Sequence, residues 1–183
     1  MISINVSQLL KQPPGTTRDL DFSDWLAELR PEFELASPVE GHAHLLRTSR
    51  GIFVSSEYRT SVRQVCGRCL SPTIVEIQGS SDDEFVPTVD VLSGHVLAEQ
   101  PESEELAIDE RHVLSLSEVI RQDLLTRLPL QALCEPDCPG LCPECGRELR
   151  SDGCTCGHRT EESSPFARLA ELFRGDASER LPE

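Results

Sequence analysis

The chain has 183 residues and 38 % hydrophobic side chains, which is enough for one ordinary domain or a domain with a small appended module. No stretch approaches about eighteen consecutive apolar residues, so we expect no helix that spans a membrane. The 32 acidic residues outnumber the 17 basic ones and give a net charge of −15, which disfavours bare nucleic acid and favours a basic protein partner.

The N-terminal part of the chain predicts short elements. Residues 1–8 alternate weakly between apolar and polar side chains, which is typical of a short strand. A loop is expected at residues 11–17, and residues 22–29 predict a turn of helix around Trp25. The first twenty residues lack a basic start followed by an apolar core. No secretory signal is therefore expected, and we expect a cytoplasmic protein.

A period-two pattern typical of antiparallel strands begins at Val39 and extends to Phe85. Three strands are predicted: residues 39–48, residues 52–65, and a third that carries Thr73, Val75 and Ile77 on one face. The turn between the second and third strands is Cys66-Gly67-Arg68-Cys69, so this Cys-x-x-Cys pair is expected at the tip of a hairpin. His42 and His44 lie on the first strand and are predicted to be surface residues.

Charge is distributed unevenly along the chain. Residues 82–110 hold ten Asp or Glu and no Lys or Arg, and we interpret them as an acidic, partly flexible segment. This segment is either a solvated loop or a surface that attracts a basic partner. Between residues 47 and 68 the sequence contains five arginines and a single acidic residue, Glu57. They form either an ordinary solvent face or a local contact for RNA.

The clearest helix follows the acidic segment. After a short strand at residues 106–113, Ser115 with Glu118 three residues on has the pattern of a capping box. Apolar residues then recur at helical spacing as far as Pro129, and we interpret the stripe as core packed against the sheet. Its members are Leu116, Val119, Ile120, Leu124 and Leu128. Further on, residues 160–164 predict a polar linker and residues 165–173 a short amphipathic helix.

Eight cysteines occur in closely spaced pairs, which are Cys66 and Cys69, Cys134 and Cys138, Cys142 and Cys145, and Cys154 and Cys156. Two cysteines two to four residues apart can both bind one tetrahedral ion, because the turn between them directs both sulfurs inward. Eight thiols complete two four-cysteine sites, and we predict two zinc ions, with iron as the other metal to consider. Disulfides are the weaker alternative, since a cytosolic chain keeps its thiols reduced.

Two groupings of these cysteines are compatible with their spacing. In the grouping that we favour, the last four cysteines form a self-contained zinc knuckle. The first four cysteines form a second site, which links the middle of the chain to its C-terminal part. The alternative pairs Cys66 and Cys69 with Cys142 and Cys145, as in a zinc ribbon. In both groupings we expect the metal to have mainly a structural role, because metal–thiolate bonds contribute to the free energy of folding.

Three stretches together resemble the bacterial YceD family (DUF177): VCGRCL with the strand that follows it, SLSEVIRQDLLTRLPLQALCEPDCPGLCPECGREL, and SPFARLAELF. The similarity extends in order over about residues 1–175. It implies a role in accumulation of 23S ribosomal RNA and hence in assembly of the large ribosomal subunit. Family members that lack the last knuckle but keep a Cys-x-x-Cys turn favour two independent metal sites.

The expected fold is α+β, with a mostly antiparallel sheet or partly open barrel, a few packing helices and a C-terminal cysteine-rich zinc-binding module. The expected divisions are a YceD-like domain at residues 1–133, the zinc-binding module at 134–159, and a linker with a short helix at 160–183.

The expected function is that of a non-enzymatic assembly factor that binds a basic ribosomal protein or precursor large-subunit rRNA, without a small-molecule substrate. No nucleophile motif, phosphate-binding loop or catalytic zinc motif is present in the sequence, and a site of four thiolates is closed to substrate. The alternatives are a direct RNA-binding module and a zinc-based redox-switch chaperone. Five arginines are candidate contacts for RNA or a protein partner: Arg59, Arg63, Arg68, Arg147 and Arg150.

Overall fold

A computed structural model describes residues 1–26, 33–98, 101–150, 154 and 156. The chain divides into two compact units, Met1–Cys138 and Pro139–Glu183. The elements of the first unit, in chain order, are β1 (Ser3–Asn5), α1 (Ser7–Leu10), β2 (Thr17–Asp24), β3 (Glu34–Leu35), β4 (Val39–Arg47), β5 (Ile52–Val65), β6 (Pro72–Pro87), the 3-10 turn η1 (Glu104–Leu106), β7 (Ala107–Ile108), β8 (Val113–Ser115) and α2 (Ser117–Arg127). The limits of the three divisions drawn from the sequence stay a prediction.

The main sheet is built around one long hairpin. Strands β5 and β6 pair from Ile52 opposite Phe85 to Val65 opposite Pro72. The strand order is β2-β4-β5-β6-β7, with β3 beside β5, and every pairing is antiparallel except that of β6 with β7. Strands β1 and β8 form a second, two-stranded sheet. The described residues therefore form the expected α+β fold with mostly antiparallel strands, and both sheets are open rather than closed into a barrel.

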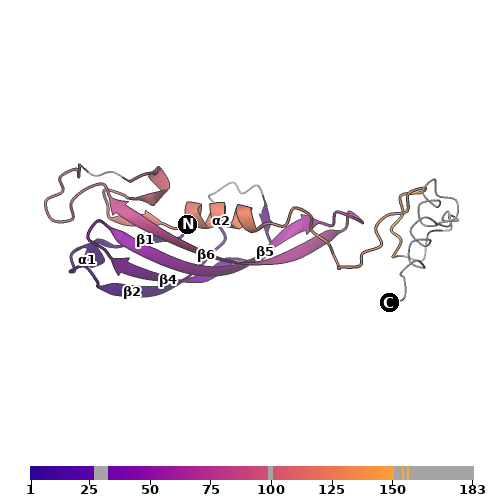
Figure 1. The fold of residues 1–183 in the computed structure, drawn as a ribbon, viewed down its shortest axis with the longest axis horizontal. Coiled ribbons are helices and arrows are strands. Elements are labelled where there is room, and N and C mark those ends of the chain that lie inside the picture. The colour runs from indigo at the N-terminus through magenta and orange to yellow at the C-terminus, as the bar shows by residue number, and fades with distance from the viewer. Residues whose placement is uncertain (27–32, 99–100, 151–153, 155, 157–183) are drawn as a thin grey trace, which may run out of the picture. The chain divides into compact units, whose positions relative to one another are not determined.

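The two faces of the main sheet differ in burial because side chains alternate along each strand. On β5, Val54, Tyr58 and Val62 are buried, whereas Glu57 and Arg59 are exposed. We call the buried side the core face and the side that carries Glu57 the outer face. Figure 1 shows α2 lying along one side of β5 and β6, and the buried residues of α2 belong to the same apolar core as Tyr58.

A row of alternating aromatic residues and glycines crosses the core face. Phe22, Gly41, Tyr58 and Gly79 are successive cross-strand partners on β2, β4, β5 and β6. The ring of Phe22 covers Gly41 and the ring of Tyr58 covers Gly79, where a Cβ atom would lie 2.5 Å and 2.3 Å from ring carbons. The Tyr58 hydroxyl then donates to Asp123 Oδ2 of α2 over 2.7 Å. This contact fixes the helix against the hairpin.

Two local predictions for the first unit are wrong. A helical turn was expected to begin at residue 22, but residues 17–24 form strand β2. Backbone pairing with β4 determines the conformation of these residues. The predicted capping box at Ser115 is also absent: α2 begins at Ser117, and the Glu118 carboxylate accepts from Arg121. Ser117 Oγ instead accepts from the Ile2 backbone N–H over 2.8 Å.

Other predictions lie partly or wholly outside the described residues. The linker at residues 160–164 and the amphipathic helix at residues 165–173 are not described. In the acidic segment, residues 82–87 continue strand β6, and the segment further holds η1 and β7. The short strand expected at residues 106–113 corresponds to β7 and to the start of β8, which are separate elements.

Candidate metal centres

The tip of the β5–β6 hairpin holds the first two thiols. Cys66 and Cys69 follow directly on β5, and both are buried, with 0 % and 5 % exposure. The Leu70 N–H donates to the Cys66 carbonyl over 2.9 Å, and the Cys66 N–H donates to the Ser71 carbonyl over 2.9 Å. These two hydrogen bonds close a tight turn that holds both sulfurs on one side. The Cys-x-x-Cys pair thus lies at the tip of the hairpin, as the sequence predicted.

The segment after α2 brings the next two thiols to the same place. The Gly67 N–H donates to the Ala132 carbonyl over 2.8 Å, and Arg68 Nη1 donates to the Cys138 carbonyl over 2.9 Å. The Gln131 side chain packs over Gly67, where a Cβ atom would lie 2.7 Å from it, so a larger residue at position 67 would displace this glutamine. Cys134 and Cys138 therefore lie beside the hairpin tip, within the first unit.

The four sulfurs of this first cluster have the spacing that a tetrahedral ion requires. Cys66 Sγ lies 3.8 Å from Cys138 Sγ, and Cys69 Sγ lies 3.7 Å from Cys134 Sγ. All four sulfurs lie within 4.8 Å of one another. A zinc ion with bonds of about 2.3 Å places its sulfurs about 3.8 Å apart, whereas a disulfide needs about 2.05 Å. All eight cysteines are free, and the sulfur spacing of this cluster is compatible with one shared metal ion.

The electrostatics of the first cluster favour a bound cation. Backbone N–H groups of Cys69, Cys134 and Arg68 donate to the Cys66 sulfur and lower the pKa of this thiol to about 6. Burial and contact with the thiols of Cys138 and Cys69 raise the pKa of Cys134 to about 12. Four thiols this close can all ionise only beside a strong positive charge, and a divalent metal supplies that charge.

The second cluster lies in the second unit and consists of Cys142, Cys145, Cys154 and Cys156. Its sulfurs also lie within 4.8 Å of one another, and Cys145 Sγ is 3.7 Å from Cys154 Sγ. Backbone N–H groups of Cys145 and Glu144 lower the pKa of Cys142 to about 6. The structure thus groups the eight sulfurs in the way that the sequence analysis favoured, and the zinc-ribbon alternative is not formed. That these sites bind metal stays a proposal.

The two Cys-x-x-Cys turns have the same backbone design. The Gly146 N–H donates to the Cys142 carbonyl over 2.9 Å, as the Leu70 N–H does to Cys66, and the Cys142 N–H donates to the Arg147 carbonyl over 2.7 Å. The residue after the second cysteine is left-handed in both turns, with φ of 62° at Leu70 and 70° at Gly146. Glycine adopts this conformation freely, whereas it costs a leucine roughly 1–2 kcal/mol.

The five predicted arginine contacts are divided between the two units, three in the first and two in the second. Arg59 Nη2 pairs with Glu40 Oε2 at 3.2 Å, and Arg63 Nε pairs with Glu34 Oε1 at 3.2 Å. Arg68 supports the first cluster through the Cys138 carbonyl. The other two lie in the second unit, where Arg150 Nη2 is 3.5 Å from Glu148 Oε1 and the Arg147 carbonyl accepts from Cys142. Their role in binding RNA or a partner stays a prediction.

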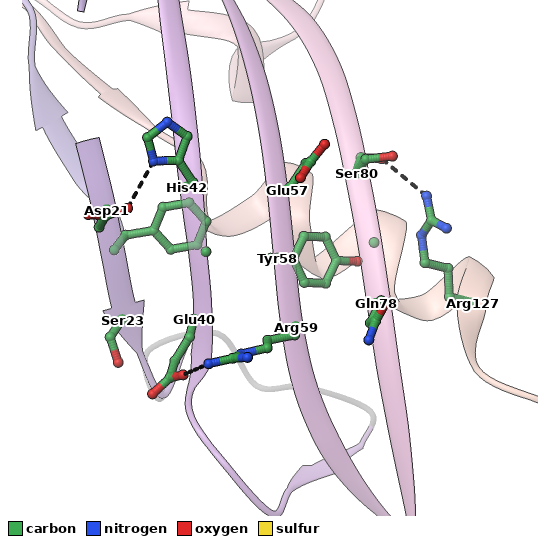
Figure 2. Close-up of a pocket in the computed structure, with 13 residues that line it drawn as sticks. Asp21, Ser23, Glu40, His42, Glu57, Tyr58, Arg59, Gln78, Ser80 and Arg127 are labelled. Atoms are coloured by element: carbon green, nitrogen blue, oxygen red, sulfur yellow. Dashed lines mark hydrogen bonds and ion pairs between the residues drawn. The ribbon is translucent and has the colours of Figure 1, made fainter. Parts of the chain in front are cut away.

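One feature that the sequence analysis missed is an open hollow of about 790 Å³ on the sheet. Figure 2 shows its lining: Asp21 bonds to His42, and Glu40 bonds to Arg59, with Glu57 on the same strand as Arg59. The hydrogen bond from His42 Nδ1 to Asp21 Oδ1 is 2.9 Å long and raises the pKa of His42 above its ordinary value. The alternation on β4 indicated that His42 is exposed, but only the β2–β4 register brings Asp21 beside it.

Fold and site together define an α+β protein with two four-cysteine clusters that could hold metal ions. The family model described as "Large ribosomal RNA subunit accumulation protein YceD" matches residues 54–173, a range that includes both clusters. The chain belongs to this YceD family, which confirms the resemblance found in the sequence. The family name links the chain to accumulation of large-subunit ribosomal RNA.

Mycobacterial relatives are similar over most of the chain. Uncharacterized proteins of Mycobacterium tuberculosis (strain H37Rv) and Mycobacterium bovis are each 31 % identical over 134 residues, which is 73 % of this chain and 60 % of each relative. An uncharacterized protein of Mycobacterium leprae is 24 % identical over 152 residues, or 78 % of this chain and 63 % of the relative. The chain thus matches about three fifths of the length of these relatives.

No solved structure matches the chain. Among the residues that the structure describes, no helix is long and apolar enough to cross a membrane.

Proposed function

We propose that the protein is a non-enzymatic, cytoplasmic factor in ribosome biogenesis that supports 23S rRNA accumulation by binding a basic ribosomal protein of the large subunit. The observation that carries this proposal is the family match, which spans both cysteine clusters. The net charge of −15 supports a protein partner over RNA, because phosphate backbones carry the same sign as this chain. Precursor rRNA would then be affected through the partner.

The proposal gives the metal a structural role. Two zinc ions would be held by the two four-cysteine clusters, and a bound ion would supply the positive charge that lets all four thiols of a cluster ionise. In the first cluster, Cys66 and Cys69 belong to the hairpin tip and Cys134 and Cys138 follow α2. A shared ion would therefore link two segments that lie about seventy residues apart and would hold the tip of the sheet in place.

Direct binding of rRNA by the exposed arginines is the weaker alternative. Arg59 and Arg63 are exposed, yet each pairs with a glutamate, so an RNA phosphate would have to compete with an existing ion pair. Binding through these residues predicts that replacing them lowers the salt dependence of RNA affinity.

The test is genetic. Deleting the gene should lower the ratio of 23S to 16S rRNA and reduce the free large-subunit peak in a sucrose gradient, and the wild-type gene should restore both. A gene in which Cys66 and Cys138 are serines should fail to restore them, because the first cluster cannot form. An unchanged ratio of 23S to 16S rRNA in the deletion strain would contradict the proposed function.

A further inference from the structure

Exposed apolar side chains gather at the hairpin tip, next to the first cluster. Val65 is 57 % exposed, Leu70 is 63 % exposed and Ile74 is 58 % exposed. Val65 ends β5, Ile74 lies near the start of β6 opposite Arg63, and Leu70 lies in the turn between the strands. Beyond Arg63, no third strand pairs with this end of the hairpin within the described residues. The register places Val65 and Ile74 on the same outer face, diagonally across the hairpin, and exposed apolar side chains near one another are typical of a docking site.

Leu70 is the member of this group that the fold does not need. The turn requires a left-handed residue after the second cysteine, and the matching turn of the second unit has Gly146 there. At position 70 the chain instead keeps a leucine whose conformation is unfavourable and whose side chain packs in no core. An unfavourable backbone conformation that brings no folding contact points to a role outside the fold.

The outer face beside this apolar group is acidic. Going from Ile74 along β6, the next outward residues include Glu76 and Asp82, and Glu57 lies on β5 opposite Ser80. Glu57, Glu76 and Asp82 are exposed and form no ion pair among the described residues. The outward arginines of the hairpin, in contrast, are already paired with glutamates of β3 and β4. The unpaired charge on this surface is therefore negative, and its complement is cationic.

We propose that the hairpin tip and the acidic outer face together form the docking surface for a basic polypeptide. An apolar side chain of the partner packs on Leu70, Val65 and Ile74, while its Lys or Arg side chains face Glu76 and Glu57. This inference rests on the proposed function and deepens it, because it states where a basic ribosomal protein binds. RNA is the disfavoured occupant, since the surface repels phosphate and offers no unpaired arginine on the outward side of β5.

The test uses the full-length, metal-loaded protein and a panel of individually purified, fluorescently labelled large-subunit ribosomal proteins. Anisotropy titration should find at least one panel member that binds. Leu70→Asn should weaken that binding about tenfold, because an apolar contact is lost while asparagine tolerates the left-handed backbone. Leu70→Met should keep most of the affinity. The melting temperature of Leu70→Asn should equal or exceed that of the wild type, which shows that lost binding is not lost folding.

Two further variants separate the apolar from the electrostatic part of the surface. Glu57→Gln with Glu76→Gln should lower affinity at low salt and reduce its salt dependence, whereas Leu70→Asn should leave the salt dependence unchanged. The matched control is Leu92→Asn, because Leu92 is 82 % exposed in a loop away from the hairpin tip. It should bind as the wild type does.

Several results would overturn the inference. One is a Leu70→Asn protein that binds the panel member with wild-type affinity. Another is a panel in which no ribosomal protein binds. The third is Leu70-dependent binding of a transcribed 23S rRNA fragment when no panel protein binds. The strain test keeps the two proposals apart. If deletion lowers 23S rRNA and Leu70→Asn restores it fully, the docking surface fails while the proposed function stands. If deletion leaves 23S rRNA unchanged, the proposed function fails.

Discussion

Cys138→Ser should destabilise the first unit strongly, whereas Cys145→Ser should have little effect on the stability of the first unit. Cys66 and Cys138, whose sulfurs are 3.8 Å apart, are separated by 72 residues, so a shared ion closes a long loop. A cross-link over a loop of this length stabilises a fold by about 4 kcal/mol in the chain-entropy treatment. For a chain of this size, such a loss lowers the melting temperature by roughly 8–16 °C.

The chain provides its own optical probe for this comparison. The single tryptophan, Trp25, and the single tyrosine, Tyr58, both lie in the first unit. Thermal unfolding followed by their fluorescence therefore reports on the first unit. Cys138→Ser should shift this transition downward by the stated amount, with the loss of one metal ion per chain.

Cys145→Ser is the matched control, because it removes one thiol from the second cluster in the same way. Its sulfur neighbour Cys154 is only 9 residues away, and both lie in the second unit. The aromatic transition should therefore move by no more than about 2 °C. Equal shifts in the two variants, or a Cys138→Ser protein that melts like the wild type, would refute the view that the first cluster holds the hairpin to the segment after α2.

Three further outcomes follow from the contacts of the first unit. Arg68→Ala should weaken metal retention by the first cluster about tenfold in a chelator competition, because it removes the hydrogen bond to the Cys138 carbonyl; retention equal to the wild type would make Arg68 unimportant for the site. Tyr58→Phe should lower the free energy of unfolding in urea by about 1 kcal/mol, since the 2.7 Å bond to Asp123 is lost, and a change below about 0.3 kcal/mol would count against that anchor. Backbone donors lower the pKa of Cys66 to about 6, so its ionised form is favoured above that pH and the stabilisation is lost as the pH falls through about 6. Protons also compete with a metal ion for all four thiolates, so metal content after gel filtration should decrease as the pH is lowered from 8; metal content that does not change with pH would contradict binding by thiolates.

The parts of the structure that could be predicted from the sequence depend on local patterns. The β5–β6 hairpin follows from alternation on both sides of a four-residue turn, so Cys66 and Cys69 were expected at its tip. The buried stripe of α2 follows from helical spacing, and Ile120 and Leu124 are fully buried as expected. The grouping of the last four cysteines follows from their closeness in the sequence, because all four lie in the same short segment.

The parts that could not be predicted depend on contacts between distant residues. Strand β2 is rich in polar and acidic side chains, and only its pairing with β4 makes it a strand. The start of α2 is fixed by Ile2, which donates to Ser117 from the other end of the unit, so the local capping pattern at Ser115 was misleading. The left-handed conformation of Leu70 was likewise hidden, because a leucine does not signal a positive φ as glycine does.

The first and second clusters also differ in what sequence spacing could establish. Nothing in the spacing of Cys134 and Cys138 shows that they meet Cys66 and Cys69, since the fold itself supplies the contact through Gly67, Arg68 and the end of α2. An ion bound in the first cluster would for this reason stabilise the first unit, whereas an ion bound in the second cluster would stabilise the second unit.

The central claim, that two four-thiolate sites hold metal and stabilise the fold, is tested most directly by the metal content of the purified, full-length protein. Elemental analysis combined with native mass spectrometry should find two zinc ions per chain, and chelation should release them with loss of the aromatic signal from the first unit. A chain that contains no metal and still shows the complete folded signal would contradict the account.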